Sequence, residues 1–354
     1  MKMVIAGGGT GGHLFPALAL AEEVTGRGGE VLLMGSGRKI EQIALEKTPY
    51  QVKPLPVEGV FGRSIPGKFR ALGKMIWATF VSTRAIKRFA PQLVFGVGGY
   101  ASVPTLLAAK LLGIKSALHE QNTIPGRANL FLARLVDRIF VTFPETRRYF
   151  PKEKTIVSGM PIRKGLRRGR REHEGIGLLV TGGSQGARTI NEAMLEIAPA
   201  LFQAVPNLFL VHQTGSADYE RVKKAYQERS LKAIVLPFIK DMAWAYAQAD
   251  VVLARAGAAT VAELCYLKKP AILIPYPYAV ADHQRENARF LVKAKGALMF
   301  LENELTPAKL LKALTELLTD ADRRRAMSQK LSGLLPENAL SIIYKEMEAL
   351  AAYA

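Results

Sequence analysis

The feature of the sequence that most constrains its fold is one pattern that occurs twice, 175 residues apart. Residues 3–20 read MVIAGGGTGGHLFPALAL, and residues 178–195 read LLVTGGSQGARTINEAML. Each stretch begins with a short apolar run, continues through a glycine-rich turn and ends in a helical pattern. A strand, turn and helix of this kind open a doubly wound parallel sheet. The repeat therefore predicts two α/β domains, each built on such a sheet.

Short apolar runs alternate with amphipathic stretches along both halves of the chain, as they do in parallel sheets covered by helices on both faces. A length of 354 residues is enough for two such domains. We expect the linker near residues 158–175, which are rich in Gly, Pro and Arg, and the last helical stretch, 337–354, could lie on either domain. The expected strands are residues 4–6, 30–34, 93–97, 115–120 and 138–143 in the first half, and 178–180, 208–213, 233–238, 251–254 and 271–275 in the second.

Three glycine clusters mark the places where we expect ligands to bind. They are GGGTGGH at 7–13, GGYAS at 98–102 and GGSQGAR at 182–188, and each follows an apolar run. Glycine lets backbone amides approach a phosphate closely, and the helix that follows adds the positive end of its dipole. Open α/β sheets bind ligands at the carboxyl ends of their strands. The clusters therefore predict two phosphate-bearing substrates in a cleft between the domains.

The first cluster also satisfies the dinucleotide fingerprint G-x-G-x-x-G with Gly7, Gly9 and Gly12. A nicotinamide enzyme usually has an acidic residue at the end of the second strand, where it binds the ribose hydroxyls. Here that strand ends in MGSG at 34–37, and Glu30 stands at its beginning. The missing acid disfavours a dinucleotide.

Polar residues in the first half suggest acid–base chemistry. His13 follows the first glycine turn, and His119, Glu120 and Asn122 belong to HEQN, which ends an expected strand. A base at His13 could remove a proton from a hydroxyl group, with Glu120 or His119 as the alternative base. A structural histidine is the competing interpretation for each. The sequence has no H-E-x-x-H, no CxxC and only one cysteine, so we expect no metal site.

The second half contains candidate sugar ligands. Glu263 lies inside the helix that follows ARAG (254–257), where a carboxylate can accept two hydrogen bonds from a ribose diol. Gln284 and Asn287 are three residues apart on one helical face, as ligands of sugar hydroxyls would be. A favourable acid near a helix start is the competing interpretation for Glu263.

Residues 60–90 hold seven Lys or Arg and no Asp or Glu, in a chain whose net charge is +19. Apolar and aromatic residues are interspersed, which suggests a helix that docks on an anionic membrane face. An ordinary amphipathic helix is the competing interpretation. No nucleic-acid-binding signature accompanies the basic residues, so we expect no nucleic acid partner.

Six motifs, taken in order, resemble the signatures of one family. They are GGTGGHLFPALALA, GVGGYASVP, HEQNTIPGRAN, GGSQGAR, RAGAATVAEL and DHQRENA, and they cover most of the chain up to about residue 290. Together they resemble the MurG family, the peptidoglycan N-acetylglucosaminyltransferases that convert lipid I to lipid II. The resemblance implies a GT-B fold, with two doubly wound Rossmann-like domains whose parallel sheets face each other across a cleft. It also implies a peripheral protein on the cytoplasmic face of the bacterial cell membrane.

The same resemblance implies a role for each part of the chain. Residues 1–160 would bind the acceptor and the membrane, with the helix at about 337–354 packed back on them, and residues 161–336 would bind UDP-GlcNAc. The donor diphosphate would lie near Ser184, uracil near Ile239, the ribose at Glu263 and GlcNAc at Gln284. The full donor set is Thr10, Gly11, Gly12, Asn122, Arg163, Ser184, Gln185, Ile239, Gly257, Ala258, Ala259, Thr260, Glu263, Gln284 and Asn287. The acceptor diphosphate would lie against Gly98, Gly99, Tyr100 and Ser102. The membrane-docking residues would be Phe69, Arg70, Lys74, Ile76, Trp77, Phe80, Arg84 and Lys87.

The implied reaction is an inverting transfer of GlcNAc from UDP-GlcNAc to the muramoyl 4-hydroxyl of lipid I, without a cofactor or an essential metal. The implied partners are both substrates, the anionic membrane surface and other cell-wall synthesis or division proteins. Another GT-B transferase acting on a lipid acceptor is the alternative enzyme, which HEQN and the acceptor loops disfavour. A non-enzymatic nucleotide-binding scaffold is the other alternative, disfavoured by the paired donor and acceptor motifs.

Overall fold

The computed structural model describes residues 1–354 except 9–10, 39–40, 42–47, 58–64 and 353–354. The chain divides into two compact units. The first unit comprises Met1–Arg163 and Pro336–Ala354, and the second unit comprises Lys164–Leu335. The division falls three residues after the boundary expected at 160, and the C-terminal segment groups with the first unit.

The first unit is built on a seven-stranded parallel sheet with strand order β3-β2-β1-β4-β5-β6-β7. Its order reverses between β1 and β4, so the loops after these two strands meet at a topological switch point, where such sheets bind ligands. The strands are β1 (Lys2–Ala6), β2 (Glu30–Gly35), β3 (Gln51–Pro54), β4 (Leu93–Gly96), β5 (Lys115–Glu120), β6 (Arg138–Val141) and β7 (Thr155–Val157).

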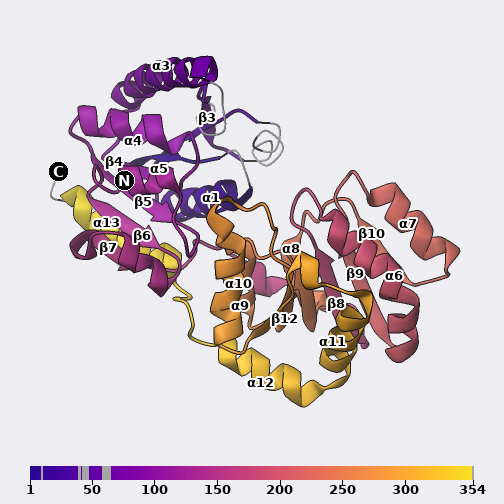
Figure 1. Cartoon of the computed structure of the whole chain (residues 1–354). Helices are drawn as coiled ribbons and strands as arrows, with labels where there is room; N and C mark the ends of the chain where they lie inside the picture. Colours follow the sequence, from indigo (N-terminus) through magenta and orange to yellow (C-terminus); the bar gives the residue numbers. More distant parts are fainter. Residues whose placement is uncertain (9–10, 39–40, 42–47, 58–64, 353–354) are drawn as a thin grey trace. The chain divides into compact units, whose positions relative to one another are not determined.

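Helices cover both faces of this sheet because side chains alternate along each strand. Met3 and Ile5 of β1 face a core shared with α1 and α13. Val4 and Ala6 face the opposite core, shared with α3, α4 and α5 (Figure 1). The helices are α1 (Gly11–Gly26), α3 (Ile65–Phe89), α4 (Ser102–Leu111), α5 (Arg127–Leu132) and α13 (Ala339–Ala352), with short 3-10 turns η1 (Pro144–Tyr149) and η2 (Lys152–Lys154).

The second unit repeats this plan with six parallel strands in the order β10-β9-β8-β11-β12-β13. Its switch point lies between β8 and β11, and apolar residues of β8, α6 and α11 share one hydrophobic core. The strands are β8 (Ile176–Thr181), β9 (Leu208–Gln213), β10 (Ala233–Leu236), β11 (Val251–Ala254), β12 (Ala271–Leu273) and β13 (Ala297–Met299). The helices are α6 (Arg188–Ala204), α7 (Tyr219–Glu228), α8 (Met242–Gln248), α9 (Ala258–Leu267), α10 (His283–Lys293), α11 (Pro307–Thr319) and α12 (Ala321–Leu331), with 3-10 turns η3 (Leu166–Arg168), η4 (Val280–Asp282) and η5 (Glu302–Glu304).

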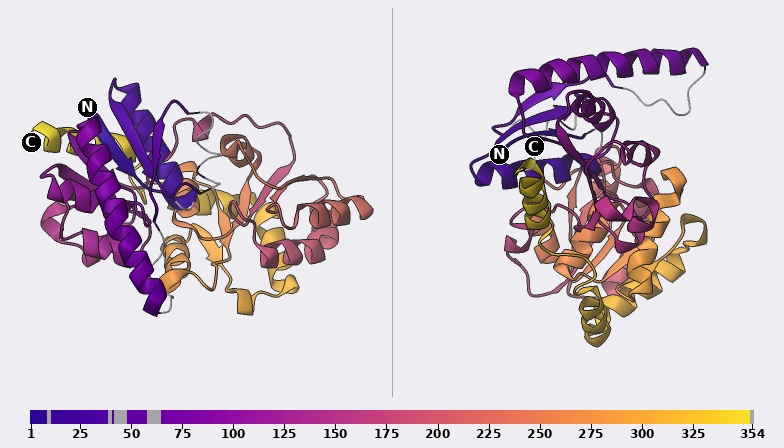
Figure 2. Two further views of the ribbon diagram at one scale, coloured as in Figure 1. Left: turned by 90° about the horizontal axis from the view of Figure 1, so that it is seen from above. Right: turned by 90° about the vertical axis from the view of Figure 1, so that its left-hand side faces the viewer.

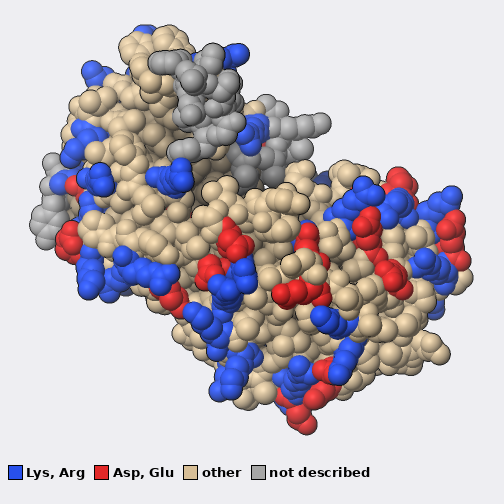
Figure 3. Space-filling model, in the orientation of Figure 1, with Lys and Arg blue, Asp and Glu red and all other residues tan. Residues whose placement is uncertain are grey.

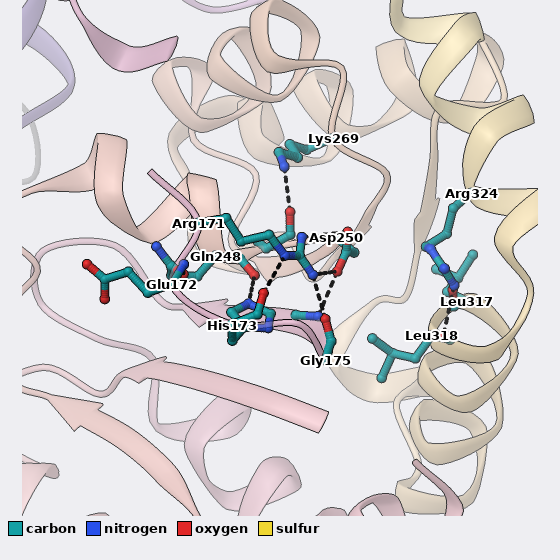
Figure 4. Close-up of polar contacts among 12 residues, drawn as sticks. Arg171, Glu172, His173, Gly175, Gln248, Asp250, Lys269, Leu317, Leu318 and Arg324 are labelled. Carbon is teal, nitrogen blue, oxygen red and sulfur yellow. Dashed lines mark hydrogen bonds and ion pairs between the residues drawn. The ribbon is translucent and has the colours of Figure 1, made fainter. Parts of the chain in front are cut away.

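The segment that leads into β8 is anchored at the amino ends of β8 and β11 (Figure 4). Arg171 donates to both carboxylate oxygens of Asp250 at 3.0 and 2.7 Å, and Asp250 also accepts from the backbone N–H of Gly177. The buried amide of Gln248 accepts from the N–H of Glu172 and donates to the carbonyl of Arg170. The last part of the expected linker, residues 170–175, is therefore fixed to the second unit at the edge opposite its glycine loop.

Helix α3 forms the outer layer on its face of the first unit, with α4 packed beneath it (Figures 1 and 2). Four of the α3 side chains that the structure describes are buried, and three of them are small: Ala71, Ala78, Ser82 and Ile86. Among the described residues, no helix combines the length and apolar character needed to traverse a bilayer.

Candidate substrate sites

The first two residues of the loop after β1, Gly7 and Gly8, are closely packed. A Cβ added to Gly7 would lie 2.0 Å from Cγ2 of Val97, and one added to Gly8 would lie 2.3 Å from Oε1 of Glu41. The buried Glu41 carboxylate accepts from the backbone N–H groups of Ser36 and Gly37, at 3.2 and 2.8 Å. An acid therefore does lie beside the end of β2, a few residues further along the chain than the fingerprint places it. Its carboxylate serves the loop, which keeps a dinucleotide disfavoured.

Arg163 lies beside the beginning of α1. Its guanidinium stacks on the ring of Phe15, with Cζ 3.8 Å from the ring centroid, and the same ring lies over Gly11. Gly11 and Gly12 form the first turn of α1, and Gly12 is exposed. Thr10, which was predicted to border the donor sugar, lies outside the described residues.

The imidazole of His13 lies against the turn after β4. A Cβ on Gly98 would be 3.0 Å from Cε1 of His13, and a Cβ on Gly99 would be 3.3 Å from its Cδ2 atom. Both glycines have a positive φ, 83° and 78°, which favours glycine in any case. The structure thus brings His13 together with two of the residues predicted for the acceptor diphosphate.

The other two residues predicted for the acceptor diphosphate, Tyr100 and Ser102, differ in exposure. Tyr100 is exposed, whereas Ser102 is buried and its hydroxyl lies 2.9 Å from the carbonyl of Ala6 and 2.8 Å from that of Gly98. The Ser102 side chain therefore holds the turn in place, and α4 begins at this residue with no side-chain cap.

His119 and Glu120 at the end of β5 are enclosed by the protein. Nε2 of His119 donates to the carbonyl of Gly159 at 2.9 Å, and its Nδ1 accepts from the amide of Gln121 at 3.1 Å. These bonds fix a neutral ring, and burial lowers the pKa of His119 to about 4 against the opposing effect of the Gly159 bond. This histidine is built into the core of the first unit.

The Glu120 carboxylate organises the loop that follows it. It accepts from the backbone N–H groups of Asn122 and Gly126, at 2.8 and 3.1 Å, and from the side chain of Asn129 at 2.8 Å. Burial raises the pKa of Glu120 even though these hydrogen bonds oppose it. Asn122 is held partly exposed by this carboxylate, in the position where the resemblance implies a donor contact.

The glycine loop of the second unit is a tight turn after β8. The N–H of Gly186 donates to the carbonyl of Gly183 at 2.9 Å, and the two glycines have φ values of 76° and 82°. A Cβ on Gly186 would lie 1.9 Å from the carbonyl oxygen of Thr214. The turn presents Ser184 partly exposed and Gln185 exposed, directly before the beginning of α6.

Gln213 connects this loop to the end of β10, a role that sequence reasoning missed. Its amide nitrogen donates to the carbonyl of Gly183 at 2.6 Å, and its amide oxygen accepts from the N–H of Ile239 at 2.9 Å. Gln213 ends β9, one of the expected strands, so its position at the ligand edge was visible in the sequence. The two hydrogen bonds of Gln213 could not be predicted from the sequence, because they depend on which loops the folded sheet places beside its side chain.

Glu263 lies on α9, which begins at Ala258 after the N-cap residue Gly257. Its Oε2 atom accepts from the phenol of Tyr246 at 2.7 Å, and the rest of the residue is partly exposed. Ala258, Ala259 and Thr260 form the first turn of α9, so their amides are those of a helix N-terminus.

The two predicted sugar ligands on α10 are placed differently. Gln284 is partly exposed, and its Oε1 accepts from the N–H of Tyr276 at 3.0 Å. Asn287 is buried and donates to the carbonyl of Ala256 at 3.2 Å, next to the beginning of α9. Asn287 therefore supports the turn before α9, and of the two Gln284 is the more accessible to a ligand. Three or more His, Cys, Asp or Glu side chains that could hold a metal ion do not gather anywhere in the described parts of the chain.

The exposed side of α3 carries large apolar side chains. Leu72, Ile76, Trp77 and Phe80 are 54%, 65%, 58% and 56% exposed, and the rings of Trp77 and Phe80 stack at 5.5 Å. Arg70, Arg84 and Lys87 are exposed on the same helix and Lys74 is partly exposed, while the side chain of Phe69 lies outside the described part. On the face drawn in Figure 3, Lys and Arg spread over the first unit with few acidic neighbours.

Comparisons with known proteins agree with this architecture. Residues 3–141 match the model of the glycosyltransferase family 28 N-terminal domain, and residues 177–340 match that of the family's C-terminal domain. Two curated relatives carry the name UDP-N-acetylglucosamine–N-acetylmuramyl-(pentapeptide) pyrophosphoryl-undecaprenol N-acetylglucosamine transferase. The one from Geobacter metallireducens is 42% identical over 98% of both chains, and the one from Myxococcus xanthus is 46% identical over 96% of this chain and 90% of its own.

A solved structure supports the same relationship. The crystal structure of Acinetobacter baumannii MurG superposes with a TM-score of 0.77 at 31% identity, covering 99% of this chain and 100% of that one. The two parallel-sheet units are therefore those of a GT-B fold, as the resemblance implied. The chain belongs to glycosyltransferase family 28, in the MurG group of N-acetylglucosamine transferases.

Proposed function

We propose that the protein transfers GlcNAc from UDP-GlcNAc to the muramoyl 4-hydroxyl of undecaprenyl-diphospho-MurNAc-pentapeptide, lipid I, and so makes lipid II for peptidoglycan synthesis. The observation that carries this proposal is 42% identity over 98% of the chain to a relative named for that reaction. The six sequence motifs all fall within the matched length. Glycines with positive φ in the Gly98–Gly99 turn and in the Gly183–Gly186 turn support the proposal, because such turns let backbone amides approach a phosphate closely.

The donor is assigned to the second unit. The amides of the Gly183–Gly186 turn and the beginning of α6 would bind its diphosphate, and Ile239 would meet uracil. The Glu263 carboxylate would accept from the ribose diol, because a carboxylate has room for several donors. Gln284 would contact the GlcNAc hydroxyls, with Asn287 supporting the turn before α9.

The acceptor is assigned to the first unit. Its diphosphate would lie against the Gly98–Gly99 turn, where α4 begins without a side-chain cap. Gly98 and Gly99 both lie in the left-handed region, and Gly99 is partly exposed, so the backbone N–H groups of this turn are the proposed contacts of the anion. Tyr100, exposed in the same turn, would contact the rest of the acceptor.

In the reaction the 4-hydroxyl oxygen forms a bond to C1 of GlcNAc, and the bond from C1 to the UDP oxygen breaks on the opposite face. The configuration inverts to give a β-1,4 linkage. His13 accepts the hydroxyl proton, and the electron pair leaves with UDP. Backbone amides and Arg163 stabilise the charge that develops on the diphosphate. His119 and Glu120 are buried in hydrogen-bond networks, so His13 is kept as the base.

Helix α3 is proposed to dock on the anionic cytoplasmic face of the cell membrane. Its exposed aromatic residues would enter the interface while Arg and Lys contact lipid headgroups. A protein held there as a peripheral protein meets an acceptor that is itself confined to the bilayer. Other cell-wall synthesis or division proteins are proposed partners on the same surface.

The test is transfer of labelled GlcNAc from UDP-GlcNAc to a lipid I analogue by the purified full-length protein. A labelled lipid disaccharide with a β-1,4 linkage is the expected product. Lack of product from folded protein would refute the proposal. Transfer from UDP-glucose or UDP-GalNAc at an equal rate would point instead to a different UDP-sugar transferase.

A further inference from the structure

A buried tyrosine hydroxyl contacts the carboxylate that is assigned to the ribose. Tyr246 on α8 donates to Oε2 of Glu263 on α9 at 2.7 Å. Tyr246 is 1% exposed, and its helix α8 packs against β8 of the sheet. The phenol therefore cannot reach bulk water, and the carboxylate is its hydrogen-bond partner.

In this hydrogen bond Tyr246 is always the donor and Glu263 always the acceptor. Burial, and then the negative charge of Glu263, raise the pKa of Tyr246 well above its ordinary value of 10.0. The phenol thus stays protonated and donates at every physiological pH. A carboxylate offers about four acceptor positions, and the bond from Tyr246 occupies one of them.

The geometry also restricts the Glu263 side chain. A glutamate side chain has several rotatable bonds, and fixing it before a ligand arrives removes part of the entropy cost of binding. Here a rigid, fully buried ring from the neighbouring helix holds one of its two oxygens. A bond from a neutral donor to a charged acceptor is among the stronger hydrogen bonds in proteins.

We propose that Tyr246 is a positioning residue, which orients the Glu263 carboxylate toward the ribose hydroxyls of a uridine diphosphate ligand. This inference rests on the proposed function, because that function assigns the ribose to Glu263. Tyr246 itself does not touch the ligand. Removal of the Tyr246 hydroxyl should therefore weaken the binding only of ligands that carry the ribose hydroxyl groups.

The experiment is calorimetric titration of the full-length protein with UDP, 2′-deoxy-UDP and 3′-deoxy-UDP. For each protein the measured quantity is the ratio of the dissociation constants of a deoxy ligand and UDP. Wild type should bind UDP more tightly than the deoxy ligands. In Tyr246→Phe the ratio of the dissociation constants should be about tenfold smaller for at least one deoxy ligand. Both constants are measured on one sample, so the ratio does not depend on the fraction of protein that is folded.

Tyr226→Phe is the matched control. Tyr226 is also 1% exposed in the second unit, and its phenol contacts Nδ1 of the neutral side chain His212 at 3.0 Å. This variant should lower thermal stability and keep the wild-type ratio. In transfer assays Tyr246→Phe should raise KM for UDP-GlcNAc with little change in kcat, because positioning at the ribose is remote from the reacting carbon.

Two results would overturn the inference. If Tyr246→Phe keeps the wild-type ratio, the hydrogen bond is structural only. If wild type shows no preference for UDP over either deoxy ligand, Glu263 does not bind the ribose hydroxyls. Failure of the proposed function is distinguishable, because the protein would then not bind UDP or would transfer no GlcNAc.

Discussion

Gly98 leaves the space in which the imidazole of His13 lies beside the Gly98–Gly99 turn. A positioned general base contributes roughly 10²- to 10⁴-fold to the rate of a proton transfer. We expect His13→Ala to lower kcat by about this factor, and to leave the affinity for UDP unchanged because the donor is assigned to the second unit. Steady-state transfer assays at saturating concentrations of both substrates measure the effect. A near-normal kcat would exclude His13 as the base.

Two buried histidines make the fold sensitive to acid. Burial lowers the pKa of His119 to about 4 and that of His212 to about 3, from an ordinary value of 6.5. Between pH 6.5 and pH 4 these histidines bind protons in the unfolded chain but not in the folded protein. Their contribution to the free energy of unfolding therefore falls as the pH drops through this range. His119 alone contributes a loss of roughly 3 kcal/mol by pH 4.

Chemical denaturation at a series of pH values measures this effect as the free energy of unfolding. The two histidines should contribute a positive slope between pH 4 and 6.5, because their rings bind protons in the unfolded state and not in the folded state. His212→Gln, which cannot gain a proton, should show a shallower slope than wild type in the second unit. A free energy of unfolding that does not change over this interval would contradict the prediction.

At the residue scale the sequence predicts which positions line the ligand edges, but not which side chains are available there. HEQN ends β5 as expected, yet His119 and Glu120 turn into hydrogen-bond networks with Gly159 and Asn129. Those partners lie 40 and 9 residues away in sequence, and only the fold places them. Gln213 and Tyr246 escaped prediction for the same reason. The fold alone brings Gly183 and Ile239 beside Gln213, and Glu263 beside Tyr246.

Helix α3 has two faces that differ in exposure. One is a small, buried face against α4, and the other presents Ile76, Trp77 and Phe80 to solvent. Each Lys or Arg close to an anionic membrane contributes about 1 kcal/mol of attraction. We expect neutralisation of Arg70, Lys74, Arg84 and Lys87 to Gln to abolish most binding to vesicles that contain phosphatidylglycerol. Co-sedimentation with these vesicles, and with neutral vesicles for comparison, measures it.

The control variant has the same total charge as the α3 variant, because it loses four positive charges at other positions. Replacement of Lys224, Lys312, Arg325 and Lys330 by Gln removes four exposed charges from the second unit. This variant should still bind the vesicles, and UDP affinity should be unchanged in both. Equal losses in the two variants would show that net charge, and not α3, directs the protein to the membrane.

At the element scale the long apolar runs were predictable. The strands expected at 115–120, 208–213 and 251–254 have those bounds in the structure, and the apolar residues at 208–211 and 251–254 are typical of buried parallel strands. The edge strands β3, β7 and β13 were not expected. They have four, three and three residues, too few for any periodicity to emerge, and they form only because a neighbouring strand already presents its hydrogen-bonding edge.

At the scale of the whole molecule, the chain leaves the first unit at Arg163 and returns to it at Pro336. The repeat of strand, turn and helix predicted two domains, but the residues alone left the last helix open to either. The choice depends on apolar surface that only the folded first unit exposes. There α1 and one face of the sheet form a core that Ile343, Met347 and Leu350 complete.

This return makes the stability of the first unit depend on the end of the chain. Met347 is fully buried in the core shared with α1, and Arg27 of the first unit stacks on Tyr344 with its Cζ 4.2 Å from the ring centroid. We expect Met347→Ala to lower the free energy of unfolding of the first unit by about 2–5 kcal/mol, the usual cost of a cavity left by a large buried side chain. Differential scanning calorimetry with and without UDP measures it, since a ligand of the second unit stabilises only the unit that binds it.

The neighbouring residue provides the control. Glu348 is exposed on the same helix, so Glu348→Ala should leave the transition of the first unit nearly unchanged. In Met347→Ala the shift should appear in the transition that UDP does not raise, and UDP should bind as tightly as it does to wild type. A loss of UDP affinity equal to the loss in Glu263→Ala would show that α13 supports the second unit as well. An unchanged melting profile would mean that α13 contributes little to the core it completes.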